Sequence, residues 1–484
     1  MASPLILAID QGTSATKCVL VDEAGSILAR ASAPVGELRP QPGWVEQDAE
    51  EIWRSLQEAV RGCLADRDPG AVRAIGLSTQ RESTLLWDRQ SGKPVAPLVS
   101  WQDQRTRVVC DALRRPDTEA LVRARSGLPL DPMFSAAKAR WLLDRHDTDR
   151  GAARAGRLRL GTVDSWLLHR LTGIHATEPG NASRTQLMNV QRASWDDDLL
   201  ALFDVPRETL PELRPSRGAF GTARGLAPLP DGVPIFAVMG DSHAALYGHG
   251  ADRPGQVKAT YGTGSSVMGL IAQAEAFGAG LCLTIAWEDD AVRYAAEGNI
   301  RASGAALRWT ADLLGVTAEC AAELGLRSES GDTVLVPGFN GLGAPWWDDR
   351  AVGLFTNLSL STDRGALARA ALDAIVQQVA DVAASLPIET LHADGGPSRN
   401  EGLMQMQADV LGCPVLRGEE AELSALGAAH MAGLGAGLWT RDEWRVLPRP
   451  HRRFVPAMQE PERKAMRTRW RDAVARARLR PDAA

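Results

Sequence analysis

The sequence has no excess of basic residues. Lysine and arginine together number 54, against 60 aspartates and glutamates, and the formal net charge is −6. A protein that holds a nucleic acid needs a basic surface to neutralise its phosphates. No nucleic-acid partner is therefore expected, and any phosphate site must be local, built from backbone groups and a metal ion.

Paired cysteines and long apolar runs are also missing. The six cysteines are scattered, with no Cys-x-x-Cys pair and no histidine at zinc-ligand spacing. This distribution argues against a disulfide framework and a structural zinc site. The apolar run at residues 5–9 follows no basic segment, and no run approaches the roughly 20 residues of a membrane span. We therefore expect a cytoplasmic protein with no membrane partner.

The common nucleotide-binding signatures are absent as well. Gly92-Lys93 is followed by Pro94 and lacks the upstream glycine of a P-loop. Neither a dinucleotide fingerprint nor a His-Glu-x-x-His motif occurs. A nucleotide enzyme with this sequence would have to use another design.

What the sequence does contain is a series of β-prone runs and helical patterns. Strands are predicted at 5–10, 16–21, from 27 onward and at 72–78, with a helix that a capping box of Asp48 and Glu51 opens. In the second half, strands are predicted at 256–261, 267–271 and 389–393, with a helix at 362–386. This order indicates an α/β protein whose fold is duplicated. The Arg-rich tail from Pro461 is interpreted as a solvated helix.

Each half contains a turn that could bind phosphate. Asp10 ends the first strand and precedes Gln11-Gly12-Thr13-Ser14, and the second half repeats the pattern in Gly262-Thr263-Gly264-Ser265. An acid beside a glycine turn can hold a metal while backbone N–H groups face phosphate oxygens. The alternative is a plain β-turn with a surface aspartate. Opposed across a cleft, the two turns would clamp a polyphosphate.

Asp241 follows an apolar strand predicted at 233–239 and a glycine. A carboxylate at a strand end is well placed to take a proton from a substrate hydroxyl. The alternative is an ordinary turn residue. For His243, two residues further on, a packing or capping role is favoured.

Arg81 and Glu82 follow the strand at 72–78, and Trp101 follows another apolar stretch. Neighbouring Arg and Glu side chains offer hydrogen-bond donors and acceptors for hydroxyl groups, and a Trp ring packs on C–H bonds, a combination that suits a sugar or polyol. The alternative is an exposed ion pair and a core tryptophan. Trp166, Trp346 and Trp347 are interpreted as packing residues.

The order of these motifs resembles the FGGY carbohydrate kinases, and within that family the glycerol kinases. The similarity extends from Ile9 to about Gly435. The motifs are Asp10–Ser14, Gln80-Arg81-Glu82, Trp101-Gln102-Asp103 with Arg105, Gly161–Trp166, Asn181–Thr185, Gly240-Asp241, Tyr261–Gly264, Glu297-Gly298, Ala344–Asp348 and Asp394-Gly395-Gly396.

The resemblance implies an α/β fold of two actin-like (ribonuclease H-type) domains, with the active site in the cleft between them. Residues 1–247 would form an N-terminal domain that binds the acceptor, Mg²⁺ and phosphate. Residues 248–445 would form the ATP-binding domain, and 446–484 a helical tail. Domain closure would exclude water from the reaction.

The resemblance also implies roles for single residues. Asp10 would hold Mg²⁺, and Asp241 would be the base that removes the proton of the acceptor hydroxyl. ATP would be bound by Gly12, Thr13, Ser14, Thr263, Gly264, Gly304, Gly396 and Asn400. The acceptor would be bound by Arg81, Glu82, Trp101, Met133, Asp241 and Ser242.

Two of these positions differ from the family's glycerol kinases. Met133 stands where they carry a tyrosine, and Ser242-His243 where they usually carry Gln-Gln. The expected reaction is ATP-dependent phosphorylation of a small polyol or sugar, with glycerol to glycerol 3-phosphate first. A tetritol or a pentulose is the alternative, since the shorter Ser242 leaves space for a longer acceptor.

An actin- or chaperone-like ATPase without a metabolite acceptor is the alternative from a different class. Arg81, Glu82 and Trp101 argue against it, because an ATPase that only changes shape needs no polyol pocket. The expected partners are a small polyol or sugar, ATP and ADP. The oligomeric state stays open, a homo-oligomer included.

Overall fold

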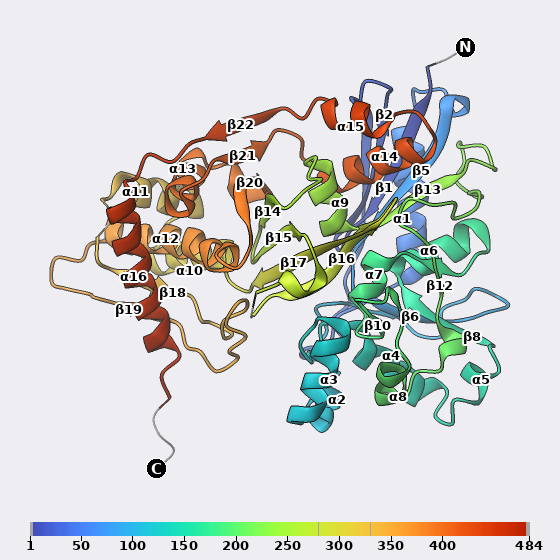
Figure 1. Ribbon diagram of the computed structural model, residues 1–484, viewed down its shortest axis with the longest axis horizontal. Helices are drawn as coiled ribbons and strands as arrows, with labels where there is room; N and C mark the ends of the chain where they lie inside the picture. The colour runs from blue at the N-terminus through green and yellow to red at the C-terminus, as the bar shows by residue number, and fades with distance from the viewer. Residues whose placement is uncertain (1–2, 279, 330, 481–484) are drawn as a thin grey trace. The chain divides into compact units, whose positions relative to one another are not determined.

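The computed structural model describes residues 3–278, 280–329 and 331–480 of the chain (Figure 1). The chain divides into two compact units. Unit 1 comprises residues 1–250, 283–294 and 422–448, and unit 2 comprises 251–282, 295–421 and 449–484. The division of function between residues 1–247 and 248–445 stays a prediction; by packing, residues 422–448 belong to unit 1.

Unit 1 is built on a five-stranded sheet in the order β13-β5-β1-β2-β3. Its strands are β1 (Leu5–Gln11), β2 (Ala15–Val21), β3 (Ile27–Pro34), β5 (Val72–Thr79) and β13 (Ile235–Gly240). The first three form an antiparallel meander, whereas β5 and β13 run parallel to β1. The carboxyl ends of β1, β5 and β13 therefore meet at one edge of the sheet, as in other open α/β sheets that bind ligands there.

The helices that pack against this sheet include α1 (Ala49–Cys63), α9 (Asp241–Gly248) and α14 (Leu423–Gly435). In Figure 1, the orange-red α14 lies beside the blue β1 and β5, although it is far from them in the sequence. Glycine permits the close approach, because a Cβ at Gly76 of β5 would lie 2.2 Å from the carbonyl oxygen of Ala428 in α14.

The predicted capping box at the start of α1 is only half right. The Asp48 side chain accepts a hydrogen bond from the backbone N–H of Glu50 and caps the helix. Glu51 instead accepts from the backbone N–H of Gly36 at 2.8 Å. A tertiary partner has replaced the local one, so the glutamate fixes the segment after β3.

The rest of unit 1 surrounds a four-stranded sheet in the order β4-β7-β6-β8. Its elements are β4 (Glu46–Gln47), β6 (Thr84–Asp88), β7 (Leu98–Val99), α2 (Arg107–Leu113), α3 (Pro116–Ser126), α4 (Ser135–His146), α5 (Gly151–Arg154), β8 (Leu158–Thr162), α6 (Val163–Thr172), β9 (Ala176–Thr177), α7 (Pro179–Ser183), β10 (Met188–Asn189), β11 (Ser194–Trp195), α8 (Asp197–Phe203) and β12 (Glu212–Leu213). A core of buried leucines, alanines and Phe203 holds α2, α3, α4, α5 and α8 to the sheet.

Unit 2 repeats the strand pattern of unit 1. Its sheet contains β14 (Gly255–Tyr261), β15 (Ser265–Ile271), β20 (Ile388–Asp394), β21 (Val415–Gly418) and β22 (His451–Phe454). β14 and β15 form an antiparallel hairpin, and β20 and β21 add parallel to β14. The hairpin followed by parallel strands matches β1, β2, β5 and β13, as the two glycine turns predicted. β16 (Cys282–Glu288) lies almost wholly in unit 1, and β17 (Val292–Ile300) is divided between the units.

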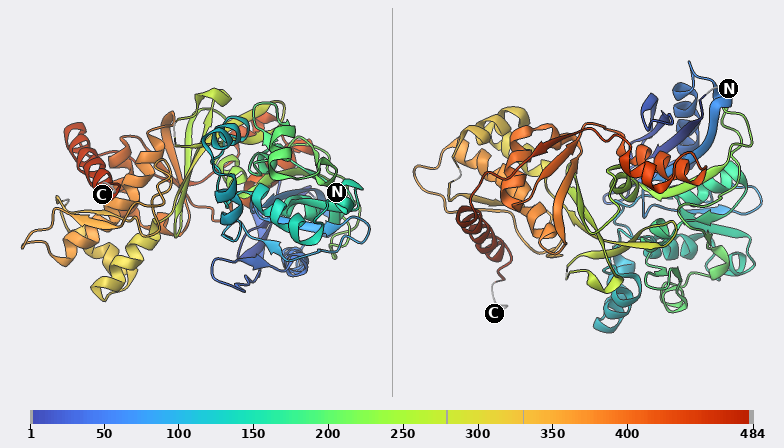
Figure 2. Two further views of the ribbon diagram at one scale, coloured as in Figure 1. Left: turned by 90° about the horizontal axis from the view of Figure 1, so that it is seen from below. Right: turned by 45° about the horizontal axis from the view of Figure 1, so that its top comes forward.

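The helices of unit 2 are α10 (Gly304–Leu314), α11 (Ala318–Arg327), α12 (Arg364–Ala383), α13 (Glu401–Leu411) and α16 (Glu460–Ala477), with a small hairpin of β18 (Val334–Val336) and β19 (Leu354–Thr356). In Figure 2 the dark red α16 stands beside the orange helices. Within the described part of the chain, every helix falls short of the length and apolarity needed to cross a membrane.

The expectation of a solvated tail helix is wrong for one face of α16. Trp470, Val474 and Ala477 of this helix belong to the same buried cluster as Leu335. The indole N–H of Trp470 donates to the Asp381 carboxylate at 2.7 Å, beside an ion pair of Asp381 with Arg467. The many arginines of the helix conceal this apolar stripe in the sequence.

Trp470→Phe is expected to lower the free energy of unfolding by about 1–3 kcal/mol, because Asp381 loses a buried donor. Trp309→Phe is the matched control: Trp309 lies in the same unit, is 41% exposed, and should change stability by about 0.5 kcal/mol or less. Urea unfolding of the two variants gives both values. Equal effects would contradict a buried, hydrogen-bonded tail helix.

Candidate active site

Two carboxylates stand at the carboxyl edge of the unit 1 sheet. Asp10 lies near the end of β1, opposite Ser78 of β5, whose hydroxyl donates to the Asp10 carboxylate at 2.7 Å. Asp241 follows directly after β13. Burial, and then the charge of Asp241, raise the pKa of Asp10 to about 7. The predicted metal-binding and proton-accepting residues therefore lie close enough to repel each other.

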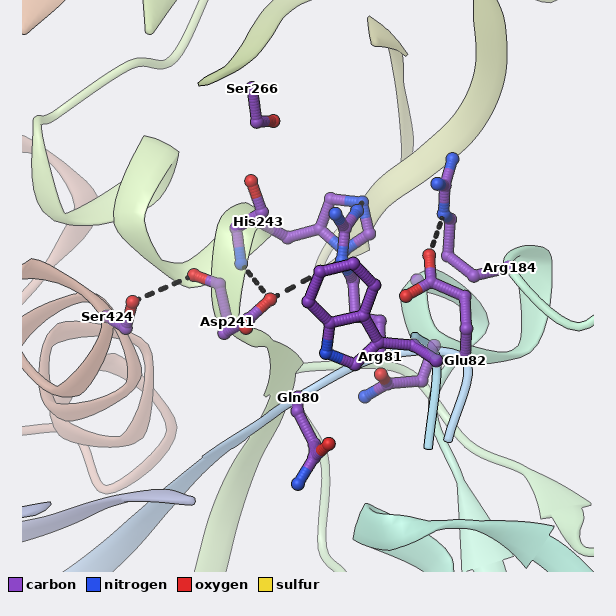
Figure 3. Close-up of polar contacts among 12 residues, drawn as sticks. Gln80, Arg81, Glu82, Arg184, Asp241, His243, Ser266 and Ser424 are labelled. Carbon is purple, nitrogen blue, oxygen red and sulfur yellow. Dashed lines mark hydrogen bonds and ion pairs between the residues drawn. The ribbon is translucent and has the colours of Figure 1, made fainter. Parts of the chain in front are cut away.

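Oδ1 of the Asp241 carboxylate contacts two neighbouring groups, as Figure 3 shows. This oxygen accepts from the backbone N–H of Ser242 at 2.6 Å and lies 3.4 Å from Nε of Arg81. The Arg81 side chain is 8% exposed, and that of Asp241 37%. The Ser424 hydroxyl of α14 donates to the Asp241 backbone carbonyl at 3.0 Å. The carboxylate is thus oriented by a buried arginine and a backbone N–H, yet it is open to a ligand.

Glu82 is fixed in an unusual backbone conformation beside Arg81. Its φ is +62°, in the left-handed region, and hydroxyls of Thr84 and Ser135 donate to its carbonyl oxygen. Its carboxylate accepts from Nε of Arg184 at 2.6 Å, and both side chains are almost fully buried. A positive φ at a non-glycine residue persists only where its surroundings enforce it, and such residues cluster at functional sites.

Trp101 links the predicted acceptor site to the first phosphate turn. Its indole N–H donates to the Thr13 hydroxyl at 3.0 Å, and the residue is 37% exposed. The N–H of Gly12 donates to the Ala15 carbonyl at 3.0 Å, which closes the turn that contains Thr13 and Ser14. Predicted ATP-binding and acceptor-binding residues are therefore in direct contact within unit 1.

A buried glutamine network, which the sequence analysis missed, supports this turn. Gln47 donates to the Thr13 carbonyl at 2.7 Å, and Gln80 donates to the side chains of Gln47 and Gln11. The Ser83 hydroxyl donates to Gln80 and accepts from the Trp101 backbone N–H. Burial of three glutamine side chains is unfavourable unless they are hydrogen-bonded. The network connects the phosphate turn at Thr13 with the acceptor residue Trp101.

The segment around Met133 is anchored by a buried lysine, which the sequence did not reveal either. Lys138 is fully buried and donates to the carbonyls of Pro132 at 2.8 Å, of Met133, and of Phe134 at 3.3 Å. Burial lowers the pKa of Lys138 to about 8, against the opposing charge of Glu82. The anchor fixes the half-buried Met133 in the segment that precedes α4.

The predicted ATP-binding residues of unit 2 lie on three glycine-containing turns. A Cβ at Gly264, after β14, would lie 2.3 Å from the Ile300 carbonyl, and one at Gly304 2.6 Å from the Gly262 carbonyl. Gly395 has φ +89° and lies against Tyr261, whereas a Cβ at Gly396 would meet nothing within 4 Å. These turns pack backbone on backbone and leave an open face at Gly396, where a ligand can approach closely.

The remaining residues of this set contact neighbouring elements of unit 2. Arg308 of α10 donates to the Thr263 hydroxyl at 3.0 Å, and the Thr263 carbonyl accepts from the N–H of Ser303. Asn400 caps α13 by accepting from the Leu403 N–H at 2.9 Å. The amino end of α10, beside Thr263, is favourable for an anion.

A magnesium ion fits Asp10. Carboxylate oxygens are the ligands that Mg²⁺ prefers. A bound cation would offset the cost of burying the Asp10 charge and its repulsion by Asp241, which together raise the pKa of Asp10. Among the residues that the structure describes, no three or more His, Cys, Asp or Glu side chains gather in a metal-holding group. Mg²⁺ in phosphoryl-transfer enzymes needs only one or two carboxylates, because substrate phosphates complete its shell.

Comparisons with known proteins match both halves of the chain to the two domains of one protein family. Residues 5–248 match the N-terminal domain of the FGGY family of carbohydrate kinases, and residues 257–436 match its C-terminal domain. The chain is 46% identical to the apulose kinase of Pectobacterium atrosepticum over the full length of both. It is 42% identical to the glycerol kinase of Thermus brockianus, with 98% of each covered.

Solved structures of such kinases share the fold. The glycerol kinase of Plasmodium falciparum with ADP has a TM-score of 0.93 and 27% identity, covering 99% of both chains. The xylulose kinase of Rhodospirillum rubrum has a TM-score of 0.86 and 25% identity, covering 97% of this chain and 98% of that one. The predicted α/β class with two actin-like domains is confirmed.

Proposed function

The chain belongs to the FGGY family of carbohydrate kinases, and from this we propose that it phosphorylates a tetritol or pentulose with ATP, using Asp241 as the base. The observation that carries the proposal is the pair of Arg81 and Asp241, a half-open carboxylate oriented by a buried cation. Glu82, the next residue after Arg81, and Trp101, which contacts Thr13, are proposed to bind an acceptor with several hydroxyls through polar and aromatic contacts.

In the proposed reaction, the acceptor hydroxyl lies against the Asp241 carboxylate. Its proton passes to Asp241 while its oxygen forms a bond to the γ-phosphorus, and the bond from that phosphorus to the β,γ-bridging oxygen breaks, so that ADP leaves. Arg81 and the Ser242 N–H fix the plane of the carboxylate through Oδ1. Such positioning and charge stabilisation are most of what phosphoryl transfer requires.

Mg²⁺, when bound, would neutralise phosphate charge, and Asp10 is the residue proposed to hold it. Gly12, Thr13 and Ser14 are proposed to bind phosphate from the β1–β2 turn. Thr263, Gly264, Gly304, Gly396 and Asn400 are proposed to bind the nucleotide in unit 2. The close packing of Gly264 and Gly304 against neighbouring backbone supports this role, because rigid turns lose little entropy when a nucleotide binds.

Met133 and Ser242 favour an acceptor longer than glycerol. Neither side chain supplies the phenol or carboxamide that the family's glycerol kinases place at these positions, so a small polyol loses two polar partners. Each lost hydrogen bond costs about 1 kcal/mol or more. Similarity to an apulose kinase at 46% identity supports the ketose class. Glycerol is the second candidate, favoured by the 42% identity to glycerol kinases.

An acceptor panel tests the proposal. We expect kcat/KM at saturating Mg-ATP to be at least about tenfold higher for one pentulose or tetritol than for glycerol, the equivalent of 1.4 kcal/mol. If glycerol has the highest kcat/KM of the panel, the proposed acceptor is glycerol and not a pentulose or tetritol.

Met133→Tyr combined with Ser242→Gln should shift the preference toward glycerol. The two side chains restore a phenol and a carboxamide and remove space, so we expect the ratio of kcat/KM for glycerol to that for the best pentulose to rise about tenfold or more. The single variants serve as controls and should each give part of the shift. An unchanged ranking would show that these two positions do not line the acceptor pocket.

A further inference from the structure

We infer that His243 is a positioning residue, which acts through Arg81 to orient the Asp241 carboxylate. This inference rests on the proposed function. His243 lies in the first turn of α9 and is fully buried. Its Nε2 lies 3.5 Å from Nη1 of Arg81 and 3.2 Å from the Thr284 hydroxyl (Figure 3). The same guanidinium contacts Asp241 through Nε at 3.4 Å.

The contact with Arg81 favours one form of the imidazole, whereas the Thr284 hydroxyl can pair with either form. A guanidinium has only donors, so its contact with Nε2 requires that nitrogen to accept. The ring is then neutral, with its proton on Nδ1. A doubly protonated ring would put a second cation against Arg81. Arg81 therefore bridges two acceptors, the imidazole on one side and the carboxylate on the other.

The imidazole is also fixed in place by two glycines. A Cβ at Gly240 would lie 3.0 Å from Nδ1 of His243 and 2.7 Å from Cδ of Arg81. A Cβ at Gly180 would lie 3.1 Å from the same Nδ1. The absence of a Cβ at these two glycines therefore gives the ring its space. His243 and Arg81 both pack against Gly240, so the two side chains share one tightly packed site.

A hydroxyl pair connects this unit to α7. Thr284 lies 2.8 Å from the Ser183 hydroxyl, which also donates to the Gly180 carbonyl at 2.7 Å. The next residue, Arg184, pairs with Glu82. The carboxyl end of α7 thus supports both halves of the Arg81-Glu82 dipeptide, one directly and one through Thr284 and His243.

Kinetics of three variants test whether His243 acts through Arg81. His243→Leu removes the acceptor atom and should lower kcat by about 10-fold to 100-fold while the KM for ATP changes by less than about twofold. His243→Gln keeps an acceptor and should recover kcat to within about threefold of the wild type. If His243 acts through Arg81, then Arg81→Lys combined with His243→Leu should be no slower than Arg81→Lys alone.

Two kinetic results would overturn the inference: a double variant whose loss is the product of the single losses, or a glutamine variant as slow as the leucine variant. If His243→Leu fails to fold, His243→Asn, too short to reach Arg81, takes its place in the comparison with glutamine. A wild-type chain that phosphorylates no acceptor would refute the proposed function instead.

Nitrogen-15 NMR of the wild-type imidazoles decides the inference independently of activity. We expect the His243 ring to be neutral at pH 7.5, with the proton on Nδ1 and a bare Nε2. A proton on Nε2 would contradict the contact with Arg81 and overturn the inference, whatever the chain phosphorylates.

Discussion

Asp241→Asn is expected to lower kcat for acceptor phosphorylation by about 10²-fold to 10⁴-fold, the range that a positioned general base contributes. Asparagine has the same shape, and its carbonyl oxygen can still accept from the Ser242 N–H and from Arg81. It cannot take a proton from the acceptor hydroxyl. The loss should therefore appear in kcat, with the KM for ATP within about twofold of the wild type.

Steady-state rates of ADP formation with the best acceptor measure this loss. Asp66→Asn is the matched control, because Asp66 is an exposed aspartate of the same unit, and its kcat should equal that of the wild type. A kcat for Asp241→Asn within about threefold of the wild type would remove Asp241 from the role of base.

Asp10→Asn should separate stability from activity. In the absence of divalent cations, the Asp10 carboxylate is disfavoured by burial and by the charge of Asp241. An amide removes that cost and can still accept from the Ser78 hydroxyl. We therefore expect the variant to be more stable than the wild type, with a free energy of unfolding about 1–3 kcal/mol higher. Its kcat with Mg-ATP should fall by about 10²-fold or more.

Thermal unfolding with and without Mg²⁺ provides a readout besides activity. Mg²⁺ should stabilise the wild type, because a ligand that binds only the folded state raises its stability. It should have little effect on Asp10→Asn. A variant that is less stable than the wild type without Mg²⁺, or that gains as much from Mg²⁺, would show that Asp10 is not the metal ligand.

Much of the strand pattern could be predicted, because hairpins leave a local signature in the sequence. Apolar, β-prone runs around the turns at Gly12 and Gly262 placed β1, β2, β14 and β15 within two residues of their observed ends. The match of the two halves followed from the same signature.

Long-range contacts left no such signature. The ion pair of Glu82 with Arg184 joins a strained residue after β5 to the end of α7, and neither residue type reveals the other. The same holds for the buried glutamines and for Lys138, whose polar side chains are typical of surfaces. Glu51 shows most directly why a local pattern does not predict such contacts. Its carboxylate binds the backbone N–H of Gly36, which is distant in the sequence, instead of the terminus of its own helix.

Transfer of labelled γ-phosphate from Mg-ATP to the acceptor panel, with products identified by mass, tests the central claim most directly. We predict that one short polyol or ketose raises ADP release by at least about tenfold, that its phosphate ester forms in equal amount, and that both signals are lost in Asp241→Asn. ADP release that no acceptor in the panel changes, with all label in inorganic phosphate, would contradict a kinase of this class and favour an ATPase.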